Sequence, residues 1–192
     1  MDKKEIKTVI TAGKSQSLTL RVRQTVYPAL MDGLLIGQRF GSPQCPMCGK
    51  QESARHLLAE CPVAIYTWYN LATACRWKNW AHTWAKEIVR IGPYRAPEWG
   101  PGLRRTMLIG LRPEGERNLQ EPFALMRGLT ISAILAQRNA ASQAKERAIA
   151  EGEGWDGVDH YWTATKIYSE VTQRFETGIH EERGQMRALE IA

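Results

Sequence analysis

Residues 45–62 read CPMCGKQESARHLLAECP, which spaces three cysteines and one histidine as C-x2-C-x7-H-x4-C. Two thiolates separated by two residues can bind one cation from a tight turn, and Gly49 can supply the positive backbone dihedral that such a turn often needs. His56 and Cys61 would then complete a set of three sulfurs and one nitrogen. That set selects zinc over calcium or magnesium, whose preferred ligands are oxygens. The spacing therefore predicts one zinc ion held by Cys45, Cys48, His56 and Cys61.

This ligand set has no open position for water, so it predicts a structural site rather than a catalytic one. Two alternatives remain: Cys45 and Cys48 as a redox pair, or cysteines that are buried for unrelated reasons. A thioredoxin-like pair belongs at a strand-to-helix junction, and nothing before Gln44 has the pattern of that strand. The redox hypothesis also gives no role to His56 or Cys61. Zinc is therefore favoured, and the fourth cysteine, Cys75, is expected to be a buried apolar residue.

The rest of the chain predicts a mostly α protein, in which a small CCHC zinc-knuckle region is followed by a helical bundle. Short helices are expected over 52–60 and from Pro62 to about Thr73. A long helix is expected from Pro122 to near Ala150, and Asp159 is expected to cap a final helix that Gly178 or Gly184 breaks. The predicted organisation is a flexible basic arm over 1–14, the zinc-knuckle region over 15–91, an irregular connector over 92–121 rich in Gly and Pro, and a C-terminal helical region over 122–192.

Helical spacing also predicts which side chains face inward. In the helix after Pro62, the packed face is expected to hold Ile65, Trp68, Tyr69 and Ala72. In the long helix, the inner stripe is expected to hold Phe123, Met126, Thr130, Ala133, Ile134, Gln137 and Ala141, with Arg127, Arg138, Lys145 and Arg147 elsewhere. Trp77, Trp80 and Trp84 share one helical face, which could stack on bases but is more typical of a core.

Charge is unevenly distributed along the 192 residues. The whole chain carries a net charge of +6, yet residues 1–113 hold 17 basic and 7 acidic residues, whereas 114–192 hold 9 basic and 13 acidic. A basic half joined to an acidic half suggests a polyanion-binding face, and the alternative is a mixed solvated surface. The expected phosphate contacts are Lys3, Lys4, Lys7, Arg21, Arg23, Arg39, Lys50 and Arg55.

Several classes of function find no support in the sequence. Motifs for a phosphate-cradling loop, a zinc protease and a serine hydrolase are absent, and the basic half lacks the clustered carboxylates of two-metal enzymes. Asp156, Asp159 and His160 could bind a metal or transfer protons, but turn residues and a helix cap are the favoured interpretation. No apolar run is long enough for a membrane span, and the start has no apolar core of a secretory signal. We therefore expect a non-catalytic intracellular protein, nuclear or cytoplasmic, with no membrane and no small-molecule substrate.

The segment from Leu18 through Trp80 resembles the zinc-binding region at the carboxyl end of reverse transcriptases of non-LTR (LINE-like) retrotransposons. The residues that carry the resemblance are LRVR at 20–23, CPMCG at 45–49, Glu52, HLL at 56–58, ECP at 60–62 and Trp68. A weaker match is GLTISAILAQRN at 128–139, which is similar to the helix ending in Arg-Asn that often follows the zinc region in such elements.

The resemblance implies a module that helps hold template RNA or target DNA during target-primed reverse transcription, with Cys45, Cys48, His56 and Cys61 as the zinc ligands. The polymerase's catalytic aspartates and ribonuclease H carboxylates are missing, so the chain is expected to be an excised fragment or a stand-alone product of such an element. The alternative is a repurposed protein-interaction module, such as a regulator or a pathogen effector recognised by a host receptor. Zinc would then serve only as a staple of the fold.

Overall fold

The computed structural model describes residues 43–74 and 120–191, together with Leu20, Gln24, Thr25, Pro28 and Ile36. Most of these residues belong to η2 (His56–Glu60), α3 (Pro62–Ala74), α6 (Gln120–Ala150) and α7 (His160–Ile191). The described ranges contain no strand, only an isolated antiparallel bridge between Gln44 and Gln51. The predicted mostly α fold, with a small cysteine and histidine region ahead of the helices, is confirmed. The arm over 1–14 and almost all of the connector lie outside the described residues, and the domain boundaries stay predictions.

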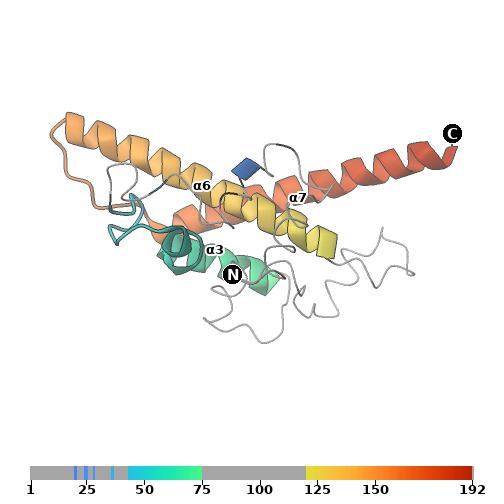
Figure 1. Cartoon of the computed structure of the whole chain (residues 1–192), viewed down its shortest axis with the longest axis horizontal. Helices are drawn as coiled ribbons and strands as arrows, with labels where there is room; N and C mark the ends of the chain where they lie inside the picture. The colour runs from blue at the N-terminus through green and yellow to red at the C-terminus, as the bar shows by residue number, and fades with distance from the viewer. Residues whose placement is uncertain are drawn as a thin grey trace.

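The two long helices α6 and α7 run in opposite directions and cross (Figure 1). Residues 151–159 join them, and α3 packs against α7 on the side where this loop lies. The segment that carries the cysteines leads directly into η2 and α3. It lies near the end of the α6 and α7 pair at which residues 151–159 connect the two helices (Figure 1). This arrangement brings the cysteine-rich segment and the C-terminal helices, which are far apart in the sequence, into one packed unit.

The sequence explains where α6 ends and α7 begins. Gly152 follows α6 with a φ of 75°, and the N–H of Glu153 donates to the Ala148 carbonyl over 2.8 Å, as in a Schellman motif. Asp159 caps α7 as predicted, because its Oδ1 accepts from the N–H of Trp162 over 2.8 Å. These caps fix the length of the connecting loop, which contacts the backbone of Pro46 and Met47 between the first two cysteines.

One hydrophobic core joins all four helical segments. Trp68 and Leu71 of α3, Ile134 of α6 and Ile167 of α7 are each at most 1% exposed. Five positions of the predicted stripe of α6 are buried, namely Met126, Thr130, Ala133, Ile134 and Ala141, and Gln137 is half-buried. The side chain of Phe123 lies outside the described part. Helical periodicity therefore identified most of the inner face of α6.

Two predictions about side-chain orientation were wrong. Tyr69 is 48% exposed, because the buried face of α3 is centred on Thr67, Trp68 and Leu71 instead. Arg127 was expected off the inner stripe of α6, yet it is only 1% exposed. Burial lowers its pKa to about 10, so it stays charged at neutral pH. Its Nε and Nη1 have no hydrogen-bond partner among the described residues.

The final helix is longer than the sequence suggested. α7 continues to Ile191 through both Gly178 and Gly184, which were expected to break it. A glycine inside a helix costs only about 1 kcal/mol relative to alanine, so neither residue is a sufficient stop signal. In the part of the chain that the structure describes, no helix combines the length and apolar character needed to cross a membrane.

Candidate metal centre

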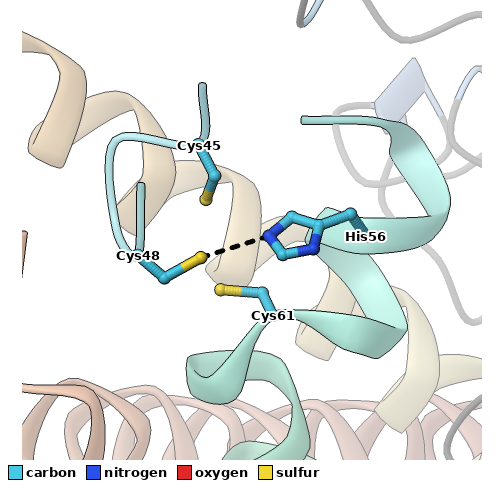
Figure 2. A group of neighbouring side chains, drawn as sticks. All are labelled: Cys45, Cys48, His56 and Cys61. Atoms are coloured by element: carbon cyan, nitrogen blue, oxygen red, sulfur yellow. Dashed lines mark hydrogen bonds between the residues drawn. The ribbon is translucent and has the colours of Figure 1, made fainter. Parts of the chain in front are cut away.

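The four predicted ligands form one cluster. The ligand atoms of Cys45, Cys48, His56 and Cys61 all lie within 4.8 Å of one another, close enough to hold one metal ion. Their side chains point toward a common centre, and Cys48 Sγ lies 3.2 Å from His56 Nε2 (Figure 2). Cys45 and Cys61 are at most 1% exposed, His56 is 5% exposed, and the three cysteines are free thiols rather than disulfides.

The first two ligands are placed by a short closed turn. The bridge between Gln44 and Gln51 brings the ends of the turn together, and the Cys45 N–H donates to the Lys50 carbonyl over 2.7 Å. The Gly49 N–H donates back to the Cys45 carbonyl over 2.8 Å. Gly49 has a φ of 75°, the left-handed conformation that glycine adopts without a steric penalty. The predicted role of Gly49 is confirmed, and the turn points both thiols to the same side.

The other two ligands are placed by the helical segment that follows. Ser53 caps it, because its Oγ accepts from the His56 N–H over 3.0 Å. η2 then closes with a bond from the Cys61 N–H to the His56 carbonyl at 2.6 Å. This i to i+5 bond makes a wider turn than an α-helix does, and such turns are frequent at functional sites. One π-type turn therefore separates His56 from Cys61, and it brings both side chains to the same centre.

Trp68 supports this turn from α3. Its indole Nε1 donates to the Leu58 carbonyl over 2.8 Å, and its side chain is fully buried. The bond gives the carbonyl of Leu58, within η2, a partner in the core. The interpretation of Trp68 as a core residue agrees with this burial, and the residue also holds the backbone between two ligands.

The thiols interact strongly with each other in the metal-free chain. The pKa of Cys45 falls to about 4, chiefly because its sulfur accepts a hydrogen bond from the Cys61 thiol. The same bond raises the pKa of Cys61, and burial raises it further. Burial also raises the pKa of Cys48. A buried thiolate next to two thiols and an imidazole favours a bound cation, and binding it would release the protons of the other two thiols.

The redox alternative for Cys45 and Cys48 loses support here. These cysteines lie in a turn closed by a two-residue bridge, not at the junction of a strand and a helix. Both sulfurs also converge with His56 and Cys61, which the redox hypothesis leaves without a role. The arrangement is that of a metal site.

The loop over 151–159, between α6 and α7, contacts the turn over 44–51, which we call the knuckle turn. Trp155 Nε1 donates to the Pro46 carbonyl over 2.8 Å. The Met47 carbonyl accepts from the Val158 N–H over 3.2 Å and lies 3.2 Å from His160 Nε2. The two residues between the paired cysteines are therefore fixed by residues more than 100 positions later in the chain. No spacing pattern in the sequence indicates these contacts.

A buried ion pair makes a second long-range contact, this time with the segment over 45–61 that carries the four ligands, which we call the metal loop. Glu52 lies between Cys48 and His56, and its side chain is fully buried. Arg138 of α6 donates to both of its carboxylate oxygens, from Nε over 2.9 Å and from Nη2 over 2.7 Å. Sequence reasoning placed Arg138 off the inner stripe of α6 and gave it no partner. Its bidentate pairing instead ties α6 to the metal loop.

Gly157 provides a direct test of the contact between this loop and the knuckle turn. It has a φ of 92°, and a Cβ there would lie 2.8 Å from the Met47 carbonyl oxygen. Gly152 has a φ of 75° with nothing within 4 Å of such a Cβ. We expect Gly152→Ala to cost about 1–2 kcal/mol for the left-handed backbone alone. Gly157→Ala should lower the free energy of unfolding, measured in urea, by clearly more than Gly152→Ala does. Equal losses from the two variants would show that the loop does not press on the turn.

The remaining candidate residues divide into three groups. Lys50 and Arg55 are exposed and lie in the metal loop itself. The other expected phosphate contacts, Lys3, Lys4, Lys7, Arg21, Arg23 and Arg39, lie outside the described residues, as do Cys75, Trp77, Trp80 and Trp84. In the cluster of Asp156, Asp159 and His160, Asp159 caps α7 and His160 contacts the knuckle turn.

No protein-family model, no curated protein and no solved structure matches this chain.

Proposed function

We propose that the metal is zinc and that its role is structural. Three sulfurs and one imidazole nitrogen form a complete tetrahedral set for zinc, with no position left for a substrate or a water. The centre is buried, and the segments that carry its ligands pack into the core of the protein. Zinc would therefore fix the loop over 45–61 against α3 and the loop over 151–159.

We further propose that this chain is a non-catalytic module that binds RNA or DNA. The observation that carries the proposal is the position of Lys50 and Arg55. Both are exposed, and both belong to the loop that the metal fixes, one just after Cys48 and one just before His56. Arg55 pairs with Glu60 over 2.8 Å, but the arginine side chain is 66% exposed. An exposed pair contributes at most about 1 kcal/mol, so a phosphate can replace the carboxylate at little cost.

The proposed origin is the tail of a LINE-like reverse transcriptase, where the module would hold template RNA or target DNA. Support comes from the two segments that carry the resemblance. Glu52 belongs to the zinc segment and Arg138 to the Arg-Asn segment, and the two side chains form the buried ion pair described above. Both segments therefore belong to one structural unit around the metal centre.

A salt titration tests nucleic-acid binding. The logarithm of the affinity for single-stranded RNA should fall linearly with the logarithm of the salt concentration, because bound phosphates release counterions. Lys50→Gln and Arg55→Gln should each lower the affinity and reduce the slope by about 0.7, the value for one contact to a single strand. Arg147→Gln, at an exposed position near the end of α6, is the matched control and should change neither quantity. Weak binding that does not depend on salt would contradict the proposal.

A further inference from the structure

The large aromatic side chains that the structure shows at the surface gather in one place. Tyr66 and Tyr69 of α3 are 43% and 48% exposed, and Tyr161 and Trp162 in the first turn of α7 are 66% and 64% exposed. We call these four residues and Lys166 the aromatic surface. Exposed aromatic residues usually occur singly, and a group of them marks a binding site.

Ring contacts connect two pairs of these residues. The rings of Tyr66 and Tyr161 meet edge to face, with centroids 6.1 Å apart and an interplanar angle of 80°. This contact joins α3 to α7, and Trp162 follows Tyr161 directly in the chain. Tyr69 lies one turn after Tyr66 on the same side of α3. The ammonium of Lys166 lies 5.6 Å from the centroid of the Trp162 ring, a cation–π contact at the edge of the surface.

The residue just before Tyr161 contacts the knuckle turn. His160 contacts the Met47 carbonyl, and Tyr161 is the next residue. The exposed Lys50 follows Met47 by three positions in the same turn. The first turn of α7 therefore carries two of the exposed rings and also a contact to the turn that holds Cys45 and Cys48.

We propose that the aromatic surface stacks the unpaired bases of a single-stranded nucleic acid, an inference that rests on the proposed function above. Rings that project from a surface, with a cation beside them, are how proteins bind single strands without reading sequence. α3 carries no charged residue, and Asp156 and Asp159 lie near the start of α7. Phosphates are therefore expected next to Lys166, with bases on the rings. A protein partner would also favour tyrosine and tryptophan, so the test must separate the two ligands.

The test measures the affinity of the full zinc-loaded chain for a labelled 12-nucleotide single-stranded RNA at several salt concentrations. Each lost base–aromatic stack should weaken binding by about 5-fold to 100-fold. Tyr161→Ala combined with Trp162→Ala should therefore weaken binding at least tenfold without changing the salt slope, because no phosphate contact is removed. Trp162→Phe keeps a ring and should stay within a few-fold of the wild type. Both sites are exposed, and the double variant loses only the ring contact between Tyr66 and Tyr161 and the cation–π contact of Lys166, so it should stay folded with a small decrease in melting temperature.

Two controls make the result specific. Ile149→Ala removes an exposed apolar side chain from α6, where Ile149 is 61% exposed, and should leave the RNA affinity unchanged. A duplex of the same sequence offers no unpaired base and should respond to the double substitution by less than twofold. If the wild type binds single strands and the double variant binds equally well, the stacking proposal is wrong and the surface serves another ligand such as a protein. If the wild type binds no strand at all, the proposed function itself fails.

Discussion

Replacing Cys61 with serine should abolish stoichiometric metal binding and remove at least about 5 kcal/mol of stability, because structural zinc sites contribute roughly 10–16 kcal/mol of apparent binding free energy to folding. Cys61 is fully buried and connects η2 to α3, so its loss affects the core as well as the ligand set. An excess of chelator should have a similar effect on the wild type. The measurements are zinc content per chain and thermal unfolding followed by circular dichroism.

The chain offers a matched control for this substitution. Cys75 is the one cysteine outside the ligand set, so Cys75→Ser should keep one zinc per chain. A wild-type protein with much less than one zinc per chain, or with a melting temperature that the chelator does not change, would contradict the ligand assignment. Acid should weaken the site as well, since protons compete with the metal for the thiolates.

The local parts of this centre could be predicted from the sequence because they depend on neighbouring residues. The C-x2-C turn needs only Gly49 and a short bridge, and the H-x4-C spacing needs only one helical turn. The cap at Asp159 and the inner stripe of α6 follow from equally local rules. Each of these features lies within a few residues of the side chain that it places.

The parts that could not be predicted depend on distant contacts. The knuckle turn is contacted by Trp155, Val158 and His160. These contacts form only because the packing of α6 and α7 places the loop between them next to the turn. A charged residue such as Arg127 looks like a surface residue in any helical pattern, yet the packing of the fold buries it. Helix periodicity assigns faces by hydrophobicity, so it fails at charged positions in the core and at exposed aromatic positions such as Tyr69. Both kinds of exception concern side chains whose partners are set by the tertiary fold.

Breaking the ion pair between Glu52 and Arg138 should have the second-largest effect on stability. Glu52→Gln leaves a largely buried guanidinium without its counter-charge, and Arg138→Met leaves a fully buried carboxylate without one. Removing one partner of a buried pair costs about 3–5 kcal/mol, so each single variant should unfold at much lower urea concentration. Because Glu52 lies between two ligands, both variants should also lose zinc to a chelator faster than the wild type.

The double variant Glu52→Leu with Arg138→Met separates the charge effect from simple loss of contact. Apolar residues of similar volume can replace a buried pair at little cost, so the double variant should be more stable than either single one. Arg174→Met breaks the exposed pair between Arg174 and Glu170 and should change stability by less than about 1 kcal/mol. If the two single losses simply added in the double variant, the pair would not be coupled. The metal loop would then be held to α6 by packing alone, whereas strong non-additivity, which we expect, would show that the ion pair joins the two.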